Sequence, residues 1–222
     1  MKNGQLLAAV DLGSNSFRLE IGHLDHGQIR RVEYLKETVR QGNGLDSERN
    51  LSMPAMQRGW DCLARFAERI AGFDPSRVRA VATQTLREAR NRDVFLEKAQ
   101  SILGFPIEII PGREEARLIY SGVAHLLPQS EERRLVIDVG GRSTELILGQ
   151  GLTPGTMESY RVGSIAWSKR YFADGLLNEA NFTAAIEAAK VVLQEVAAEY
   201  RALGWLSCVG ASGTVQALQE IM

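Results

Sequence analysis

Two short segments of this sequence combine an aspartate, glycines and small hydroxyl residues. They are Asp11-Leu12-Gly13-Ser14-Asn15-Ser16 and Asp138-Val139-Gly140-Gly141-Arg142-Ser143-Thr144. Each follows an apolar run typical of a buried strand. Successive backbone N–H groups in such a turn form a nest for an anion, and glycine lets a ligand approach the backbone. An aspartate at the strand end can bind Mg²⁺ or its waters. The residue types therefore predict a site for phosphate and a divalent cation.

The two segments are parts of an internal repeat. Residues 10–16 align over residues 137–143, and the match runs without a gap to Gly22 over Gly149. Glycine, asparagine, aspartate and serine are common in any turn, so one such turn alone favours an ordinary hairpin. Two matching turns, one in each half, favour phosphate binding instead. The repeat predicts two lobes of like architecture that present polar turns to a shared cleft.

These turns supply most of the candidate site. We expect substrate binding by Gly13, Ser14, Asn15, Ser16, Gly140, Gly141, Ser143 and Thr144. Asp11 and Asp138 are expected to bind Mg²⁺. A third loop lies between an apolar strand and the last helix, where unpaired N–H groups favour anions. Its candidates are Gly210, Ser212, Gly213 and Thr214. The alternative for Ser212 is a simple helix N-cap.

Hydrophobic periodicity predicts an α/β protein in which two halves repeat strands and helices. In the first half, strands are expected at residues 6–10, 17–21, 29–39, 78–83 and 107–110, and helices at 52–72, 93–103 and from 113. In the second half, strands are expected at residues 135–139, 145–148, 156–162 and 205–209, and helices at 178–203 and after 214. Both sheets are expected to be mixed, because each begins with a hairpin.

Composition narrows the class of protein. The 222 residues carry 26 lysines and arginines against 27 acids, so nothing suggests a nucleic-acid partner. No apolar run is long enough to span a bilayer, and the first is too short for a signal peptide. Cys62 and Cys208 lie far apart and are expected to be buried thiols. We therefore expect a cytoplasmic protein.

The sequence resembles the exopolyphosphatase and guanosine pentaphosphate phosphatase (Ppx/GppA) family. Besides the two turns and the third loop, the segments that carry the resemblance are residues 39–45, 82–87 and 112–119. The family implies two ribonuclease-H-like lobes of the actin-like ATPase superfold, with mixed sheets around an inter-lobe cleft. We place the lobes at residues 1–126 and 127–222. The family also implies a second lobe that continues beyond Met222, so we expect a truncated second lobe and weak or no activity.

The resemblance also implies residue roles. The second glutamate of Glu114-Glu115-Ala116-Arg117 would be the catalytic base, which places it at Glu115 and leaves Glu114 a structural role. By residue type alone, acids in a first helical turn are favoured by the helix dipole without any function. The family's metal-associated acids match Asp138 and Glu145. Arg87 matches an arginine facing the bound anion, and Arg40 is a weaker match to such an arginine.

The implied function is hydrolysis of the terminal phosphate of inorganic polyphosphate, with Mg²⁺. An alternative is hydrolysis of pppGpp, and another class is a nucleotide-binding switch or kinase-like protein of the actin superfold. A homodimer of the full-length protein is compatible with the resemblance. Arg142 stands where the family usually has a third glycine. It would be strained there at a positive φ, or else adopt an ordinary conformation and add positive charge to the loop.

Overall fold

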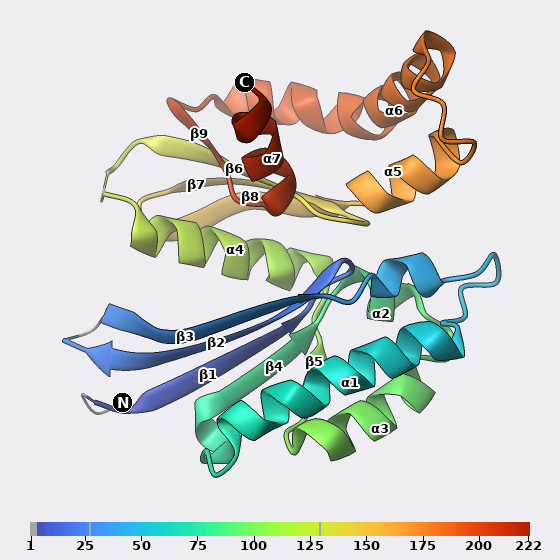
Figure 1. The fold of residues 1–222 in the computed structure, drawn as a ribbon. Coiled ribbons are helices and arrows are strands. Elements are labelled where there is room, and N and C mark those ends of the chain that lie inside the picture. The colour runs from blue at the N-terminus through green and yellow to red at the C-terminus, as the bar shows by residue number, and fades with distance from the viewer. Residues whose placement is uncertain (1–3, 27, 129) are drawn as a thin grey trace. The chain divides into compact units, whose positions relative to one another are not determined.

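A computed structural model describes residues 4–26, 28–128 and 130–222. The chain divides into two compact units, Met1–Ile110 and Pro111–Met222. Each unit has one mixed sheet with helices packed on it (Figure 1). Within the described residues, no helix is both long and apolar enough to cross a membrane.

Unit 1 contains a five-stranded sheet in the order β3-β2-β1-β4-β5. Its strands are β1 (Leu6–Leu12), β2 (Ser16–Asp25), β3 (Gln28–Thr38), β4 (Val78–Ala82) and β5 (Ile107–Ile109). β1, β2 and β3 pair antiparallel, and β1, β4 and β5 pair parallel. The helices are η1 (Gln41–Gly44), α1 (Met53–Ile70), η2 (Pro75–Arg77), α2 (Gln84–Glu88) and α3 (Arg92–Leu103).

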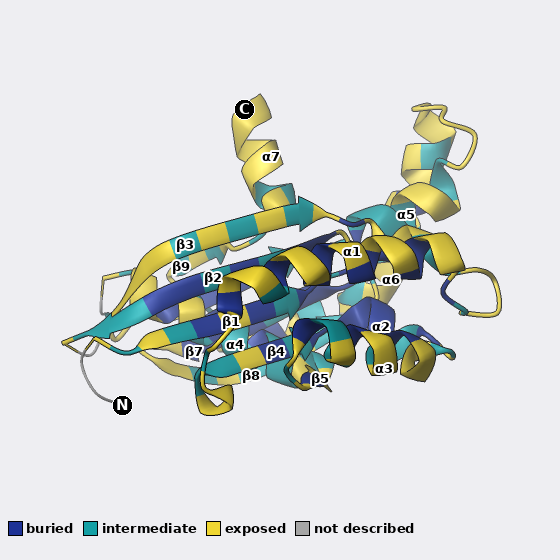
Figure 2. Cartoon of the chain, turned by 60° about the horizontal axis from the view of Figure 1, so that its bottom comes forward, coloured by how far each residue is buried: buried dark blue, intermediate teal, exposed yellow. Residues whose placement is uncertain are grey.

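The core of unit 1 lies between this sheet and α1. Successive side chains of a strand point to opposite faces, so Val10 and Leu12 are buried in the core. Asp11, between them, lies on the opposite face. Figure 2 shows the matching pattern on α1, with a buried stripe along one side and exposed residues on the other. This alternation carries the first candidate carboxylate away from the apolar core.

Unit 2 contains a four-stranded sheet in the order β8-β7-β6-β9. Its strands are β6 (Arg133–Val139), β7 (Thr144–Gln150), β8 (Thr153–Tyr160) and β9 (Ser207–Gly210). The helices are α4 (Gly112–Leu126), α5 (Ser164–Tyr171), α6 (Glu179–Leu203) and α7 (Gly213–Ile221). Val136 and Ile147 pack against α4, whereas Leu135 and Leu148 pack against Tyr200 of α6. Helices therefore cover both faces of the sheet.

The structure confirms the internal repeat. The first three strands of each unit form the same antiparallel meander, followed by a parallel strand beside the first. The register shifts at equivalent places, between Ile21 and Gly22 in β2 and between Leu148 and Gly149 in β7. A Cβ on Gly149 would lie 2.3 Å from the Tyr120 ring, and one on Gly22 would lie 2.5 Å from Ile29. Close packing explains glycine at both positions.

Some details differ from the sequence predictions. The short helices α2 and α5 were not predicted, because neither has an extended apolar stripe. β9 begins at Ser207, two residues after the expected start. The prediction that Cys208 is buried was wrong, because it lies on an exposed part of β9, whereas Cys62 is fully buried. The two compact units meet between Ile110 and Pro111, before α4, whereas the sequence placed the boundary after residue 126. α4 belongs to unit 2 because it packs on β7 and β8.

Candidate active site

The β1–β2 turn in unit 1 is closed by its own backbone. A Cβ on Gly13 would lie 2.8 Å from the carbonyl oxygen of Ser16, so only glycine fits. Ser14 and Ser16 are buried, and Asn15 is exposed. Thr85 Oγ1, at the start of α2, donates to Ser14 Oγ at 2.8 Å. Thr85 was not predicted as a site residue, although it lies within residues 82–87, one of the segments that resemble the family.

A second loop fixes this turn. The N–H of Arg40 donates to the carbonyl of Asn15, and the N–H of Gly42 donates to that of Ser14, both at 2.8 Å. Because these two carbonyls are already engaged, the backbone of the turn is held in one conformation. A preorganised turn binds an anion without the cost of ordering.

The β6–β7 turn in unit 2 has the same construction. The N–H of Gly140 donates to the carbonyl of Ser143 at 2.9 Å, and a Cβ on Gly140 would lie 3.0 Å from that oxygen. Ser143 and Thr144 are buried, and Thr144 Oγ1 donates to the carbonyl of Val162 at 2.6 Å. The two glycine–serine contacts are therefore equivalent, as the sequence alignment predicted.

Helix α5 supports the second turn. The N–H groups of Ser164 and Ile165 donate to the carbonyls of Gly140 and Gly141 at 3.0 and 2.8 Å. Gly163 precedes the helix, and a Cβ there would lie 2.4 Å from the backbone nitrogen of Arg142. Gly163 was missed in the sequence because nothing local marks it. Its importance arises from a contact with a segment about twenty residues away in the chain.

Arg142 resolves one question left open by the sequence. Among the described residues, the non-glycine residues with a positive φ are His26, Arg40 and Arg49. Arg142 therefore has an ordinary backbone conformation, and replacing the third glycine costs no backbone strain. Desolvation by burial lowers the pKa of Lys169 on α5, and the nearby positive charge of Arg142 lowers it further.

The third loop lies beside the second turn. Ile137 pairs with Gly210 across the parallel strands β6 and β9, and the N–H of Ala211 donates to the carbonyl of Ile137. Ser212 Oγ accepts from the N–H of Val215, which makes it the N-cap of α7. The same oxygen accepts from the N–H of Val139 at 3.2 Å. Ser212 thus caps a helix and joins two of the predicted anion-binding loops.

The two repeats differ in the charge opposite their aspartates. In unit 1, Asp11 is opposite Arg18 in the strand pair, and Arg18 Nη1 donates to Asp11 Oδ2 at 3.1 Å. Burial raises the pKa of Asp11, and Arg18 partly opposes this. In unit 2, Asp138 is directly opposite Glu145. Glu145 is 1% exposed and accepts a hydrogen bond from Ser159 Oγ at 2.6 Å.

Like charges directly opposite each other on one face of a sheet are destabilising. Asp138 and Glu145 have side chains on the same face as Val136 and Ile147, because residues two apart share a face. That is the face covered by α4. A cation bound there would offset the repulsion between the two carboxylates.

Helix α4 brings the two candidate glutamates of the sequence to unit 2. Glu114 forms a bidentate pair with Arg117, with contacts of 2.7 and 2.8 Å. Glu115 is in the same first turn, its N–H donates to the carbonyl of Pro111, and its Oε2 atom is buried. The bidentate pair agrees with a structural role for Glu114.

The first turn of α4 lies toward the β6–β7 turn. Tyr120 contacts Gly149 near the end of β7, and its hydroxyl donates to the carbonyl of Gly151. The helix then ends at Leu126, shortly before β6 begins at Arg133. The last turn of α4 therefore lies near the start of β6, and its first turn lies near the end of β6, where the β6–β7 turn is (Figure 1). Glu115, Asp138 and Glu145 accordingly belong to the same end and face of the second sheet.

Arg87 is held within unit 1. Its Nη1 donates to the carbonyl of Ile110 at 2.8 Å, while Nε and Nη2 donate to Gln84 Oε1 at 3.0 and 2.7 Å. These bonds orient the guanidinium and tie α2 to the end of the β5 segment. The prediction that Arg87 binds the substrate remains a prediction.

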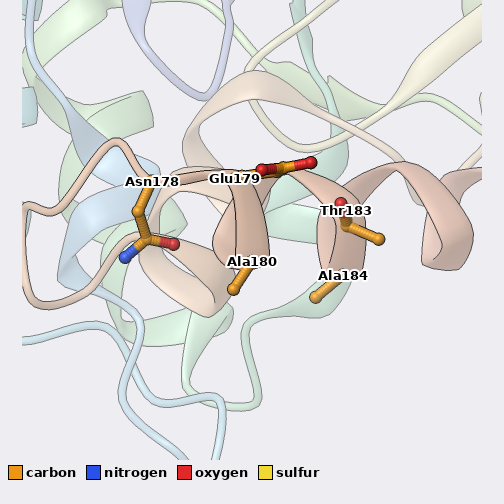
Figure 3. A pocket seen from close by; sticks show the side chains of 5 residues that line it. All are labelled: Asn178, Glu179, Ala180, Thr183 and Ala184. Carbon is orange, nitrogen blue, oxygen red and sulfur yellow. The ribbon is translucent and has the colours of Figure 1, made fainter.

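A hollow elsewhere on unit 2 contains none of the predicted residues. It lies along the start of α6 and is lined by Asn178, Glu179, Ala180, Thr183 and Ala184 (Figure 3). Asn178 accepts from the N–H of Asn181 and serves as the helix N-cap. With one carboxylate and small side chains, this hollow has no arrangement suited to phosphate chemistry.

A family model described as the Ppx/GppA phosphatase family matches residues 21–222. The chain belongs to the Ppx/GppA phosphatase family. It is 51% identical over 217 residues to the guanosine-5'-triphosphate,3'-diphosphate pyrophosphatase of Photobacterium profundum, and 54% identical over 218 residues to that of Vibrio campbellii. Each match covers 98% of this chain and 44% of the relative. The chain therefore spans less than half the length of these relatives.

Solved structures of the family share the fold. A crystal structure of an exopolyphosphatase-like protein matches with a TM-score of 0.89 at 28% identity, covering 96% of this chain and 68% of the other. The Aquifex aeolicus PPX-GPPA enzyme matches with a TM-score of 0.70 at 27% identity, covering 86% and 64%. An exopolyphosphatase from Cytophaga hutchinsonii has a TM-score of 0.87 at 24% identity, covering 98% and 70%, and shows the fold alone. The predicted α/β class with mixed-sheet, actin-like lobes is confirmed.

Proposed function

We propose that the protein carrying this chain hydrolyses the terminal phosphate of the 5'-triphosphate of pppGpp. The curated relatives named for this type of substrate are 51–54% identical to the chain. The solved structures named as exopolyphosphatases are more distant, at 24–28% identity. The sequence left polyphosphate as the main candidate and pppGpp as the alternative, and these comparisons favour the alternative.

The observation that carries a phosphoryl-transfer function is the opposition of Asp138 and Glu145 beside a glycine turn. Two carboxylates in register on one sheet face fit a divalent cation, which compensates their repulsion. Among the described residues, no group of three or more histidine, cysteine, aspartate or glutamate side chains is arranged to hold a metal. This suits Mg²⁺, which usually takes one or two carboxylates and completes its shell with water and substrate phosphates.

Asp11 fits a metal less well than its repeat counterpart. Its charge is compensated by Arg18 at 3.1 Å, which is opposite it in the strand pair, whereas the residue opposite Asp138 is the acid Glu145. We therefore propose Asp138 and Glu145 as the residues that would hold Mg²⁺. When bound, the ion would neutralise charge on the phosphates. Asp11 is proposed to fix Arg18 beside the first turn.

The remaining chemistry follows from the chain's own groups. In each unit the glycine turn offers N–H and hydroxyl donors for phosphate oxygens, and in unit 2 the third loop adds further donors. Such donors are the main requirement of phosphoryl transfer. Glu115 is proposed to orient a water and take its proton as the water attacks the terminal phosphorus. The bond to the leaving oxygen then breaks, and inorganic phosphate and ppGpp are released.

Two variants of adjacent glutamates test this proposal in the whole protein. Glu115→Gln should lower kcat for phosphate release from pppGpp by about 10²–10⁴-fold, the usual contribution of a general base. Glu114→Gln is the matched control. It should keep kcat and lose the partly exposed pair with Arg117, which contributes about 0.2–1 kcal/mol of stability.

Substrate preference is measured in the same assay, as phosphate release from pppGpp and from long-chain polyphosphate. We expect the higher kcat/KM with pppGpp. A clear preference for polyphosphate would return the assignment to an exopolyphosphatase. Unchanged kcat in Glu115→Gln would refute its role as the base.

A further inference from the structure

Arg40 occupies an unfavourable backbone conformation next to the β1–β2 turn. Its φ and ψ are 52° and 43°, in the left-handed region that non-glycine residues seldom adopt. The next residue, Gln41, is fully buried, and its side-chain nitrogen and oxygen have no hydrogen-bond partner among the described residues. Two consecutive residues thus carry an energetic cost. Such costs persist where the surrounding structure enforces them, and they cluster at functional sites.

The surrounding contacts show what enforces the conformation. The N–H of Arg40 donates to Asn15 in the turn, and its carbonyl accepts from the N–H of Asn43 at 3.1 Å. Arg58 of α1 donates from Nε to the carbonyl of Val39 at 2.9 Å, and from Nη1 to the carbonyl of Pro54 at 3.1 Å. Its Nη2 lies 3.5 Å from the carbonyl of Arg40. Arg40 is therefore fixed to the phosphate turn through its main chain.

The side chain of Arg40 is used differently from that of Arg58. The guanidinium of Arg58 donates hydrogen bonds to backbone carbonyls. By contrast, no described residue forms an ion pair or hydrogen bond with the guanidinium of Arg40. Arg40 is exposed. The main chain of Arg40 is thus fixed next to Asn15, and its guanidinium, a planar cation with five N–H donors, is available to an anion.

We propose that Arg40 binds a phosphate group of the substrate beside the β1–β2 turn. This inference rests on the proposed function, since it assigns a further contact for the same substrate. The ligand class is a phosphate chain, because guanidinium matches two phosphate oxygens at once. Arg40 is a binding residue, so its loss should weaken substrate affinity more than turnover.

Arg40→Gly is the informative variant, because glycine adopts the left-handed conformation without strain and removes only the side chain. The matched control is Arg49→Gly. Arg49 is also exposed and also has a positive φ, 66°, but its N–H bonds to Asp46 and its carbonyl to the N–H of Arg90. Both substitutions remove one positive charge and one strained residue from the same unit. The two residues differ in that Arg40 is hydrogen-bonded to the β1–β2 turn and Arg49 is not.

In the whole protein, Arg40→Gly should raise KM for pppGpp about tenfold or more, with kcat within about twofold. Arg40→Lys should give an intermediate KM, because it keeps the charge without the bidentate fork. Arg49→Gly should keep the wild-type KM. Both glycine variants should unfold at the wild-type temperature or above. These readouts separate loss of a contact from loss of structure.

Two results overturn the inference. One is a wild-type KM for Arg40→Gly in an active protein, and the other is an equal rise of KM in both glycine variants, which would indicate long-range charge alone. If the wild type releases no phosphate from pppGpp, the proposed function fails separately. Binding of inorganic tripolyphosphate, measured by calorimetry, then decides about Arg40. Weaker binding by Arg40→Gly than by Arg49→Gly supports the contact, and equal binding refutes it.

Discussion

Gly163→Ala tests whether the β6–β7 turn is held in place by helix α5. Gly163 has φ −151° and ψ 150°, an extended conformation that alanine adopts freely. Any effect of this substitution must therefore come from contact. The added Cβ would lie 2.4 Å from the nitrogen of Arg142 and 2.5 Å from its Cα and carbonyl carbon.

The size of the effect follows from those distances. An ordinary contact begins near 3.4 Å, so the turn and the start of α5 must separate by about 1 Å. The neighbours are backbone atoms, which cannot rotate away as a flexible side chain does. Overpacking of this kind costs about 1–3 kcal/mol of unfolding free energy. A displacement of about 1 Å in a catalytic constellation can lower kcat/KM about 100-fold.

Two assays of the whole protein measure these effects: urea unfolding for stability, and phosphate release from pppGpp, the proposed substrate, for activity. Gly122→Ala is the control, since a Cβ at Gly122 meets nothing within 4 Å. Gly122 lies within α4, where alanine is favoured over glycine by about 1 kcal/mol. The control should be slightly stabilised and fully active.

Wild-type activity and stability in Gly163→Ala would refute the reasoning, because the backbone contact would then not constrain the turn. Loss of stability with full activity would separate the two roles. It would show that α5 supports the fold of unit 2 but not the position of residues 140–143.

Two further predictions concern unit 1. Gln41→Met replaces a buried amide, which has no hydrogen-bond partner among the described residues, by an apolar side chain of similar length. It should raise the unfolding free energy by about 1–3 kcal/mol in urea unfolding. A loss of stability would show that the amide has a partner in solution. Arg18→Met should raise the pKa of Asp11 further above 3.8, since Arg18 opposes the upward shift that burial causes. The folded pKa of Asp11 exceeds the unfolded one, so its ionisation disfavours folding above the folded pKa, and this penalty disappears as the pH falls to 3.8. Carboxyl NMR titration and a pH series of unfolding curves measure both effects, and a lowered pKa in the variant would contradict the assignment.

Much of this architecture could be predicted from local hydrophobic patterns in the sequence. Strand alternation and helical periodicity depend on neighbouring residues, so they predicted nearly every long element of both sheets. The repeat between residues 10–22 and 137–149 predicted two similar sheets, down to equivalent glycines at Gly13 and Gly140. Short helices such as α2 and α5 escaped detection, because tertiary contacts stabilise them and not an apolar stripe of their own.

Chemical type and position after a strand were enough to predict which residues could bind phosphate and a cation. The partners of these residues follow from the tertiary fold and not from the sequence pattern. Register placed Arg18 opposite Asp11 but Glu145 opposite Asp138, so the two repeats differ in charge at one equivalent position. Packing placed α4, with Glu115, on the second sheet and Gly163 against Arg142. Such contacts join residues that are far apart in the chain, so local sequence patterns do not predict them.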